Sequence, residues 1–418
     1  MLSNLSQVAR AAKSDRPARI LIVDDSAVMR ALLRSVLGTD TRLEVAGTAA
    51  DGASAIRAMA SVRPDLVLLD VEMPGMDGVS TLKQMKAAGI RIPVIMCSSL
   101  TQRGAKVTIE ALASGAADYV AKPTGQPSRD AAVQSLAHDL VPKILALTAG
   151  ATGGQQQNPL GVAFSPSPGT ANREPAEPRT AWPGLNPPLS SPTAFSIPGA
   201  ISAPGLSTPP AGLMPPAILL IGVSTGGPAA LDVLLPALPA SFPLPVLIVQ
   251  HMPELFTKLL AERLNGRCPL RVAEAVAGAP VRAGAIHIAR GDWHMEIATG
   301  ISATPMLRLT QEAPENHCRP AADVLFRTAV PVYGSRILAV VLTGMGYDGL
   351  AGSRVIREHG GTVLAQDQAT SAVWGMPGAV AQAGLAHRIL PLSAIAPEIL
   401  RLSSRSQREA IELRESAV

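Results

Sequence analysis

The first third of the chain alternates short apolar runs with longer stretches in which apolar residues recur at helical spacing. The apolar runs have the length of strands, and they lie at residues 19–23, 66–70, 93–98 and 118–122. The stretches between them include residues 27–37 and 52–62, which we expect to be helices capped by Ser26 and Asp51. This alternation predicts a parallel sheet with crossover helices.

The second half of the chain shows the same alternation. Apolar runs at residues 217–223, 244–250 and 336–343 are expected to be strands, and residues 228–238 a helix after the first of them. The pattern predicts a second α/β domain, doubly wound and mostly parallel. In an open sheet of this kind, functional side chains lie beyond the carboxyl ends of the strands.

A proline-rich segment separates the two halves. Residues 151–216 hold 15 of the 37 prolines and only four charged residues, with no helical or strand periodicity. Such a segment cannot bury enough surface to offset the entropy of ordering it, so we expect a flexible linker. The expected boundaries are a first domain at 18–145, the linker at 146–215, a second domain at 216–405 and a tail at 406–418.

Composition excludes several classes of protein. None of the apolar runs in this chain of 418 residues approaches the roughly 20 residues of a membrane span, and the N-terminal segment lacks the apolar core of a secretory signal. Three widely spaced cysteines fit free thiols in a reducing compartment, so we expect a cytoplasmic protein without membrane insertion. The net charge of +4 is scattered and only 3% of residues are aromatic, which argues against a nucleic-acid partner.

Charged side chains occupy the expected strand ends of the first domain. Asp24 and Asp25 follow the run at 19–23, and Asp70 ends the run at 66–70. Ser98 and Lys122 end the runs at 93–98 and 118–122. Each residue alone has an ordinary explanation as a helix cap or a solvated charge. Three neighbouring carboxylates, however, repel one another unless a cation such as Mg²⁺ is present. Asp70 can then attack a phosphoryl group whose oxygens are neutralised by the metal and Lys122 and accept a hydrogen bond from Ser98.

These residues, together with DVEMPGMDG at Asp70 and GAADYVAKP around Lys122, resemble a response-regulator receiver domain. The resemblance covers residues 18–145 and implies a flavodoxin-like (βα)5 fold with Asp70 as the phosphoacceptor. The implied switch residues are Ser98, Tyr119 and Lys122. The implied ligands of Mg²⁺ are Asp24, Asp25, Asp70 and the backbone carbonyl of Glu72.

A serine-containing turn follows the first strand of the second domain. Gly222, Ser224 and Gly226 form G-x-S-x-G, which places a serine on a sharp turn between a strand and a helix. The N–H of Thr225, at the start of that helix, can face a developing oxyanion. A phosphate-binding loop or a simple turn is the alternative, but neither G-x-G-x-x-G nor a P-loop lysine is present. Ser224 is therefore a candidate nucleophile.

A base and an orienting acid are needed beside such a serine. His251 directly follows the strand at residues 244–250, and Asp348 lies in the glycine-rich loop after the strand at residues 336–343. Both are expected at the same sheet edge as Ser224. Asp323 and Asp292 compete for the third role, but neither ends a clear apolar strand. The order Ser, His, Asp differs from that of α/β-hydrolases and indicates a convergent triad.

The motifs GVSTGGP, QHMP, LTGMGYDG and QDQATSAVWGMPGAV resemble, in order, those of the protein-glutamate methylesterases of bacterial chemotaxis. The resemblance covers residues 217–400, and the receiver-like part in front completes the family's domain order. The implied catalytic residues are Ser224, His251 and Asp348, with Thr225 and the backbone of Met345 near the oxyanion. The resemblance implies that ester hydrolysis needs no cofactor.

The resemblance implies a phosphorylation-activated hydrolase that removes γ-methyl esters from glutamates of chemoreceptors, in a family that includes glutamine deamidases. The implied partners are methyl-accepting chemoreceptors and a chemotaxis histidine kinase, with the receiver covering the site until Asp70 is phosphorylated. The linker is longer than the tether usual in the family. Two alternatives stay open: a receiver-controlled esterase of another chemosensory system, and a catalytically silent protein that binds receptors or the kinase.

Overall fold

The structure is a computed structural model that describes residues 16–99, 101–123, 125–149, 215–300 and 304–415, with side chains as far as residue 404. The linker expected at 146–215 lies almost entirely outside the described residues. No helix in the described ranges has both the length and the apolar character required to cross a bilayer.

The N-terminal domain is a five-stranded sheet in the order β2-β1-β3-β4-β5, with every neighbouring pair parallel. Its strands are β1 (Ala18–Val23), β2 (Leu43–Ala49), β3 (Leu66–Asp70), β4 (Val94–Ser98) and β5 (Asp118–Ala121). Its helices are α1 (Ala27–Leu37), α2 (Gly52–Val62), α3 (Gly78–Ala87), α4 (Gln102–Ser114) and α5 (Arg129–Thr148). The parallel sheet predicted from the apolar pattern and the flavodoxin-like (βα)5 fold implied by the receiver resemblance are confirmed.

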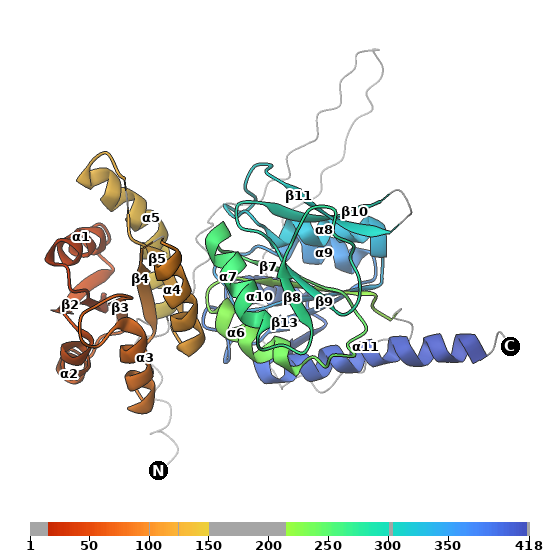
Figure 1. Cartoon of the computed structure of the whole chain (residues 1–418), viewed down its shortest axis with the longest axis horizontal. Helices are drawn as coiled ribbons and strands as arrows, with labels where there is room; N and C mark the ends of the chain where they lie inside the picture. The colour runs from red at the N-terminus through yellow and green to blue at the C-terminus, as the bar shows by residue number, and fades with distance from the viewer. Residues whose placement is uncertain (1–15, 100, 124, 150–214, 301–303, 416–418) are drawn as a thin grey trace, which may run out of the picture. The chain divides into compact units, whose positions relative to one another are not determined.

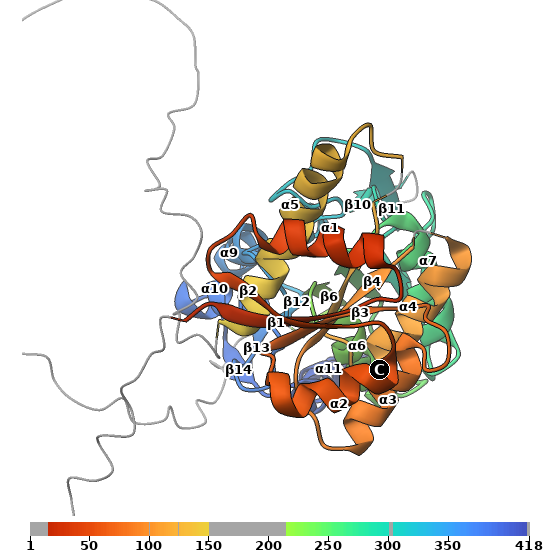
Figure 2. The same cartoon turned by 90° about the vertical axis from the view of Figure 1, so that its left-hand side faces the viewer.

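Alternate strand residues fill two cores, one on each face of this sheet. Ile20 and Ile22 of β1 pack with residues of α1 and α5, whereas Leu21 and Val23 pack with residues of α2, α3 and α4. Figure 2 shows α1 and α5 on the opposite side of the strands from α2 and α3. The caps expected at Ser26 and Asp51 are present, since their side chains accept hydrogen bonds from the N–H groups of Met29 and Ser54.

The C-terminal domain is built on a seven-stranded sheet in the order β14-β13-β12-β6-β7-β9-β8 (Figure 1). All six strand pairs are parallel. Its strands are β6 (Ile218–Val223), β7 (Val246–Gln250), β8 (Arg271–Glu274), β9 (Ala285–Ile288), β12 (Ile337–Val341), β13 (Thr362–Gln366) and β14 (Arg388–Leu390). A separate antiparallel hairpin consists of β10 (His294–Thr299) and β11 (Pro305–Thr310).

Helices cover both faces of the seven-stranded sheet, as expected for a doubly wound domain. They are α6 (Gly227–Leu234), the 3₁₀ turn η2 (Leu235–Ala237), α7 (Glu254–Asn265), α8 (Ala322–Tyr333), α9 (Leu350–Glu358), α10 (Met376–Gln382) and α11 (Leu392–Glu415). Leu219 and Ile221 of β6 pack with α6, α7 and α11, whereas Ile218 and Leu220 pack with α8, α9 and α10. The two central strands, β6 and β12, are thus buried on both faces and bring their loops to one sheet edge.

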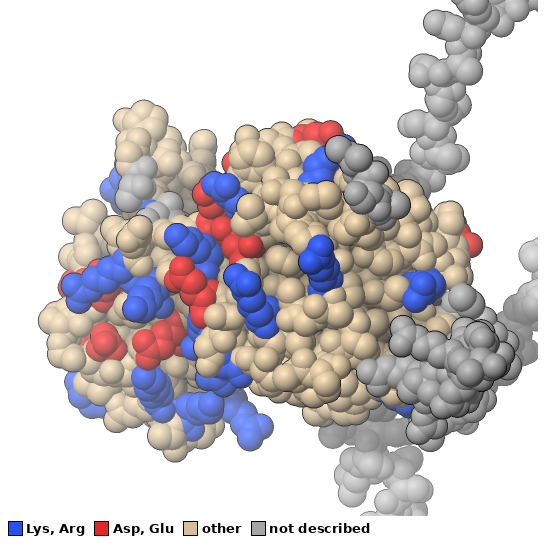
Figure 3. Space-filling model, turned by 45° about the vertical axis from the view of Figure 1, so that its right-hand side comes forward, with Lys and Arg blue, Asp and Glu red and all other residues tan. Residues whose placement is uncertain are grey.

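Two helices extend beyond the expected domain boundaries. Helix α5 continues to Thr148, three residues into the range expected for the linker. Helix α11 continues to Glu415, so most of the range 406–418 expected to be a tail is helical. On the face drawn in Figure 3, basic and acidic side chains are interspersed rather than gathered by sign, in keeping with the scattered charge of the sequence.

Candidate functional sites

The charged residues predicted for the N-terminal domain meet at the carboxyl edge of its sheet, because β1, β3, β4 and β5 are neighbours. Lys122 Nζ lies 2.7 Å from Asp70 Oδ2 and 2.9 Å from Asp24 Oδ2. Asp24, Asp25 and Asp70 each place one carboxylate oxygen within 4.8 Å of the others. Asp24 and Asp70 are buried, whereas Asp25 is exposed and open to solvent.

This carboxylate cluster fits a divalent cation. Burial raises the pKa of Asp70 to about 6, even though the hydrogen bond with Lys122 lowers it. The buried Asp24 Oδ2 accepts no hydrogen bond among the described residues, although Lys122 is near. A bound cation would reduce the repulsion among the carboxylates of Asp24, Asp25 and Asp70. Carboxylate oxygens suit a hard ion such as Mg²⁺. The N–H of Glu72 donates to Asp70 Oδ1 at 3.4 Å, which places Glu72 beside the cluster.

The two other predicted switch residues, Ser98 and Tyr119, lie in the neighbouring strands β4 and β5. Ser98 Oγ is 2.6 Å from Thr108 Oγ1 of α4 and donates to the carbonyl of Ser99 at 3.1 Å. Tyr119 of β5 is buried, and its ring stacks on Phe256 of α7 with centroids 4.4 Å apart and planes inclined by 22°. Tyr119 therefore contacts the C-terminal domain directly.

The backbone of the Ser224 turn is held by hydrogen bonds on both sides. The Ser224 N–H donates to the carbonyl of Thr343 at 3.0 Å, and the Ser224 carbonyl accepts from Gln250 Nε2 at 3.0 Å. Thr343 Oγ1 donates to the carbonyl of Thr225 at 2.9 Å. The Thr225 N–H, by contrast, has no partner among the described residues, and the Met345 N–H has none either. Two backbone donors are thus free beside Ser224.

Two glycines in these loops are required by geometry. Gly226 has φ of 79°, a left-handed conformation that glycine adopts without the cost that a side chain would add. A Cβ at Gly344 would lie 2.8 Å from the Cβ of Ser224, so the β12 loop can approach the serine only without a side chain there. The crowding of glycines around Ser224 therefore serves a tight turn and a close backbone approach.

His251 and Asp348 are in direct polar contact at this edge. His251 Nε2 lies 2.7 Å from Asp348 Oδ2, and His251 Nδ1 faces Cys318 Sγ at 3.5 Å. Burial favours the neutral imidazole, but the hydrogen bond with Asp348 outweighs it and raises the pKa of His251 above its ordinary value. The Ser224 hydroxyl makes no hydrogen bond to His251 in the described part of the chain. The register of β6 and β7, with Val223 opposite Gln250, nevertheless places Ser224 and His251 at adjacent strand ends.

Asp348 is surrounded by donors. Its Oδ2 accepts from the N–H of Ala322 at 2.6 Å, and its Oδ1 accepts from the N–H groups of Asp323 and Gly349, each at 3.0 Å. Asn316 Nδ2 donates to the same Oδ1 at 3.0 Å. Burial alone would raise the pKa of Asp348, but the hydrogen bond from His251 and these donors lower it. Asp348 is thus held ionised and oriented towards His251.

Asp323 and Asp292, the alternatives to Asp348 as the acid that orients His251, are bonded to other residues in the structure. Asp323 is buried behind Asp348, with its carboxylate bonded to Asn316 rather than to His251. Asp292 pairs with Arg319 at 2.6 Å. Sequence reasoning missed Asn316 and Cys318, because neither ends an apolar strand, and it gave no role to Thr343 and Gln250, which hold the serine turn. Gln250 was readable as a polar residue ending the β7 run.

The N-terminal domain also contacts the serine turn. Thr225 Oγ1 donates to Asp118 Oδ2 at 2.5 Å, and the Gly226 N–H donates to the carbonyl of Ala117 at 2.9 Å. Helix α4 packs against α6 and α7, and both domains belong to one compact unit. Asp118, the first residue of β5, and Ala117, which precedes it, are therefore bonded to the two residues that follow the candidate nucleophile.

Comparison with known proteins matches both domains. Residues 20–134 match the response regulator receiver domain, and residues 219–399 match the CheB methylesterase. A protein-glutamate methylesterase/protein-glutamine glutaminase of Nocardioides sp. is 46% identical over 93% of this chain and 96% of its own. The chain belongs to the CheB methylesterase family.

A second curated relative agrees with this membership, and two solved structures are similar to parts of the chain. The Trichodesmium erythraeum protein of the same name is 42% identical over 92% of this chain and 98% of its own. The crystal structure of the Thermotoga maritima CheB methylesterase catalytic domain is 41% identical and covers 45% of this chain and all of its own, with a TM-score of 0.44. The response regulator domain of the same Thermotoga protein is 40% identical over 31% of this chain and 94% of its own, with a TM-score of 0.28. A receiver in a CheB-family chain is a phosphorylated module, typically dependent on Mg²⁺.

The contact between His251 and Asp348 predicts the titration of the imidazole. NMR of the full chain should show His251 titrating above the ordinary histidine value of about 6.5, because the protonated ring is stabilised by the carboxylate. Asp348→Asn should lower that pKa by roughly 1 to 3 pH units through loss of the charge. The resonance of the exposed His138 is the internal control. An unchanged His251 titration in the variant would contradict this electrostatic coupling.

Proposed function

We propose that this chain hydrolyses γ-methyl esters of glutamate residues with Ser224 as the nucleophile. Ser224 Oγ attacks the ester carbonyl carbon while His251 accepts the hydroxyl proton. Collapse of the tetrahedral intermediate returns that proton to the leaving oxygen and releases methanol. Water then attacks the acyl enzyme through the same base and leaves a glutamate carboxylate. The observation that carries this proposal is the 2.7 Å contact of His251 with Asp348 at the edge that bears Ser224.

The roles of the two imidazole nitrogens follow from that contact. Nε2 is bonded to Asp348, so Nδ1 is the nitrogen that would accept the proton, and it must exchange its contact with Cys318 Sγ for the Ser224 hydroxyl. Because the base must be neutral and its pKa is raised, turnover should increase as the pH rises above 6.5. Asp348 fixes the tautomer and stabilises the imidazolium that forms.

The free N–H groups of Thr225 and Met345 are the proposed oxyanion donors. Neither N–H has an acceptor among the described residues, and an oxyanion that reached both donors would accept a hydrogen bond from each. The same attack on the carboxamide of glutamine would release ammonia, so the site is also chemically suited to glutamine deamidation. No cofactor takes part in either reaction as we propose it.

Asp70 is the proposed phosphoacceptor, with a histidine kinase as phosphodonor. Mg²⁺ bound by Asp24, Asp25, Asp70 and the carbonyl of Glu72 would neutralise phosphoryl oxygens. Lys122 supplies a further positive charge within 2.7 Å of Asp70. Ser98 is the proposed hydroxyl donor to the phosphoryl group, which requires its hydroxyl to give up the hydrogen bond to the carbonyl of Ser99. Displacement of Ser98 and Tyr119 would loosen the surface that contacts the serine turn.

The substrates that this activity implies are methyl-accepting chemoreceptors, and the setting is adaptation in bacterial chemotaxis. We propose cytoplasmic action, with residues 18–145 as the receiver, 146–215 as the linker, 216–405 as the esterase and 406–418 as a tail. The contacts of Asp118 and Ala117 with the turn support inhibition of the unphosphorylated protein by the receiver. Family membership and the His251–Asp348 contact disfavour a catalytically silent regulator.

Replacement of the nucleophile tests the reaction. Ser224→Ala should lower methanol release from methylated receptor membranes by roughly 10⁴-fold or more, because the proposed acyl enzyme forms on the Ser224 hydroxyl. Phosphorylation of Asp70 by an acyl phosphate should be unchanged, since that site lies in the other domain, and it serves as the folding control. Retention of more than a tenth of the wild-type rate would remove Ser224 from the mechanism.

Removal of one interdomain hydrogen bond tests the inhibition. Asp118→Ala should raise the basal rate of methanol release about tenfold, because the Thr225 hydroxyl loses its buried charged acceptor. Asp139→Ala is the matched control and should leave the basal rate unchanged, since Asp139 pairs with Lys143 of the same helix and is exposed. Asp70→Asn should stay at the basal rate with phosphodonor present. Equal basal rates for wild type and Asp118→Ala would show that this contact does not inhibit.

A further inference from the structure

The carboxylate of Asp348, a member of the candidate triad, lies next to a second buried carboxylate, that of Asp323. Asp348 is 2% exposed and Asp323 is 1% exposed. Asn316 Nδ2 donates to both, at 3.0 Å to Asp348 Oδ1 and at 2.9 Å to Asp323 Oδ2. The remaining oxygen of Asp323 accepts the N–H of Gly352 at 2.6 Å. A single neutral amide therefore separates two acids that would otherwise face each other.

The two hydrogen bonds with which Asn316 bridges Asp348 and Asp323 require a side-chain amide nitrogen. Asparagine carries two hydrogens on Nδ2, so one group can donate to each carboxylate, whereas its oxygen would be repelled by both. Asn316 has φ of 53°, in the left-handed region that asparagine tolerates better than most residues. Both the side chain and the backbone conformation at this position thus suit asparagine.

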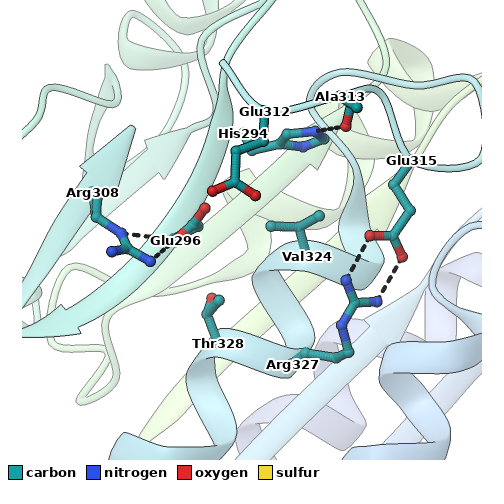
Figure 4. Close-up of a pocket in the computed structure, with 9 residues that line it drawn as sticks. All are labelled: His294, Glu296, Arg308, Glu312, Ala313, Glu315, Val324, Arg327 and Thr328. Carbon is teal, nitrogen blue, oxygen red and sulfur yellow. Dashed lines mark hydrogen bonds and ion pairs between the residues drawn. The ribbon is translucent and has the colours of Figure 1, made fainter. Parts of the chain in front are cut away.

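The segment that carries Asn316 is held by α8. Arg327 of α8 makes two hydrogen bonds to the carboxylate of Glu315, at 2.6 and 2.5 Å. Figure 4 shows this pair on the wall of a cavity that also contains His294, Glu296 and Arg308. Glu315 and Cys318 exchange backbone hydrogen bonds of 3.1 and 2.8 Å. Residues 315–318 therefore form a fixed turn, with Asn316 against Asp348 and Cys318 against His251.

We propose that Asn316 is a positioning residue for the reaction, which holds the Asp348 carboxylate in the orientation that His251 requires. This inference rests on the proposed esterase activity. Asn316 does not touch the substrate and acts through Asp348. Without the amide, Asp348 Oδ1 would lose one donor and face Asp323 directly, so the carboxylate would rotate or take up a proton.

The charges around the bridge agree with this role. Burial and the charge of Asp348 raise the pKa of Asp323 to about 6, while the hydrogen bonds from Gly352 and Asn316 oppose the rise. The other charged groups that act on the two carboxylates are His251, Glu315 and Arg327. The amide thus allows both acids to stay ionised near neutral pH.

The test replaces the amide by an acid of the same shape. Asn316→Asp in the full chain keeps the left-handed backbone preference but cannot donate when ionised. We expect kcat for methanol release to fall about 10- to 100-fold at pH 8, the loss of a hydrogen bond to a charged group, with KM within twofold of wild type. The ratio of variant to wild-type kcat should rise as the pH is lowered from 8 to 5.5. A carboxyl group beside two carboxylates binds a proton readily and can then donate it to one of them.

Two further variants separate positioning from folding. Asn316→Gly keeps the left-handed backbone without any donor, so its loss of kcat should be similar at pH 8 and show no recovery at pH 5.5. His317→Asn, at an exposed neighbour with φ of 63°, should behave as wild type. Wild-type kcat in Asn316→Asp, or identical pH dependence in the Asp and Gly variants, would overturn the inference. Absence of methanol release from the wild type would instead overturn the proposed function.

Discussion

The backbone at Ser224 and Thr225 is the constraint on which the catalytic domain depends. Its polar groups are bonded to Thr343 and Gln250, and the one group left without a partner in the described residues is the N–H of Thr225. Gly344 permits this arrangement because a side chain there would collide with Ser224. A serine fixed on a rigid turn beside a free donor is preorganised for attack on a carbonyl. The parallel sheet supplies the rigidity, since β6, β7 and β12 are buried on both faces.

The same turn explains how a distant phosphorylation site can affect hydrolysis. Asp118 and Ala117 bond to Thr225 and Gly226, so the receiver contacts the two residues that follow the proposed nucleophile. The next residue of β5, Tyr119, stacks on Phe256 of α7. A change at the β5 edge therefore alters both the access to Ser224 and the environment of the proposed oxyanion donor. The proposed regulation therefore depends on direct contacts of Ala117, Asp118 and Tyr119 with the catalytic domain.

The sequence was sufficient for the central strands of both sheets, because uninterrupted apolar runs such as residues 218–223 have few alternatives to a buried strand. It also brought Asp24, Asp70 and Lys122 together correctly, since residues at the ends of parallel strands must meet. The network behind Asp348 could not be predicted in this way. Asn316 and Cys318 lie in an irregular segment whose path depends on the Glu315–Arg327 pair. From the sequence, Asp323 was an alternative to Asp348 as the third residue of the triad. In the structure, its carboxylate bonds to Asn316 and Gly352 and not to His251.

The most direct test of the account is covalent labelling of the full chain with a fluorophosphonate, followed by mass spectrometry of the peptides. The probe forms a bond to an activated serine oxygen and expels fluoride, so it reports the nucleophile without a receptor substrate. We predict a single adduct on Ser224 that forms faster when an acyl phosphate is present and is lost in His251→Ala. An adduct confined to other serines, or a Ser224 adduct whose rate is independent of His251 and of phosphodonor, would contradict the account.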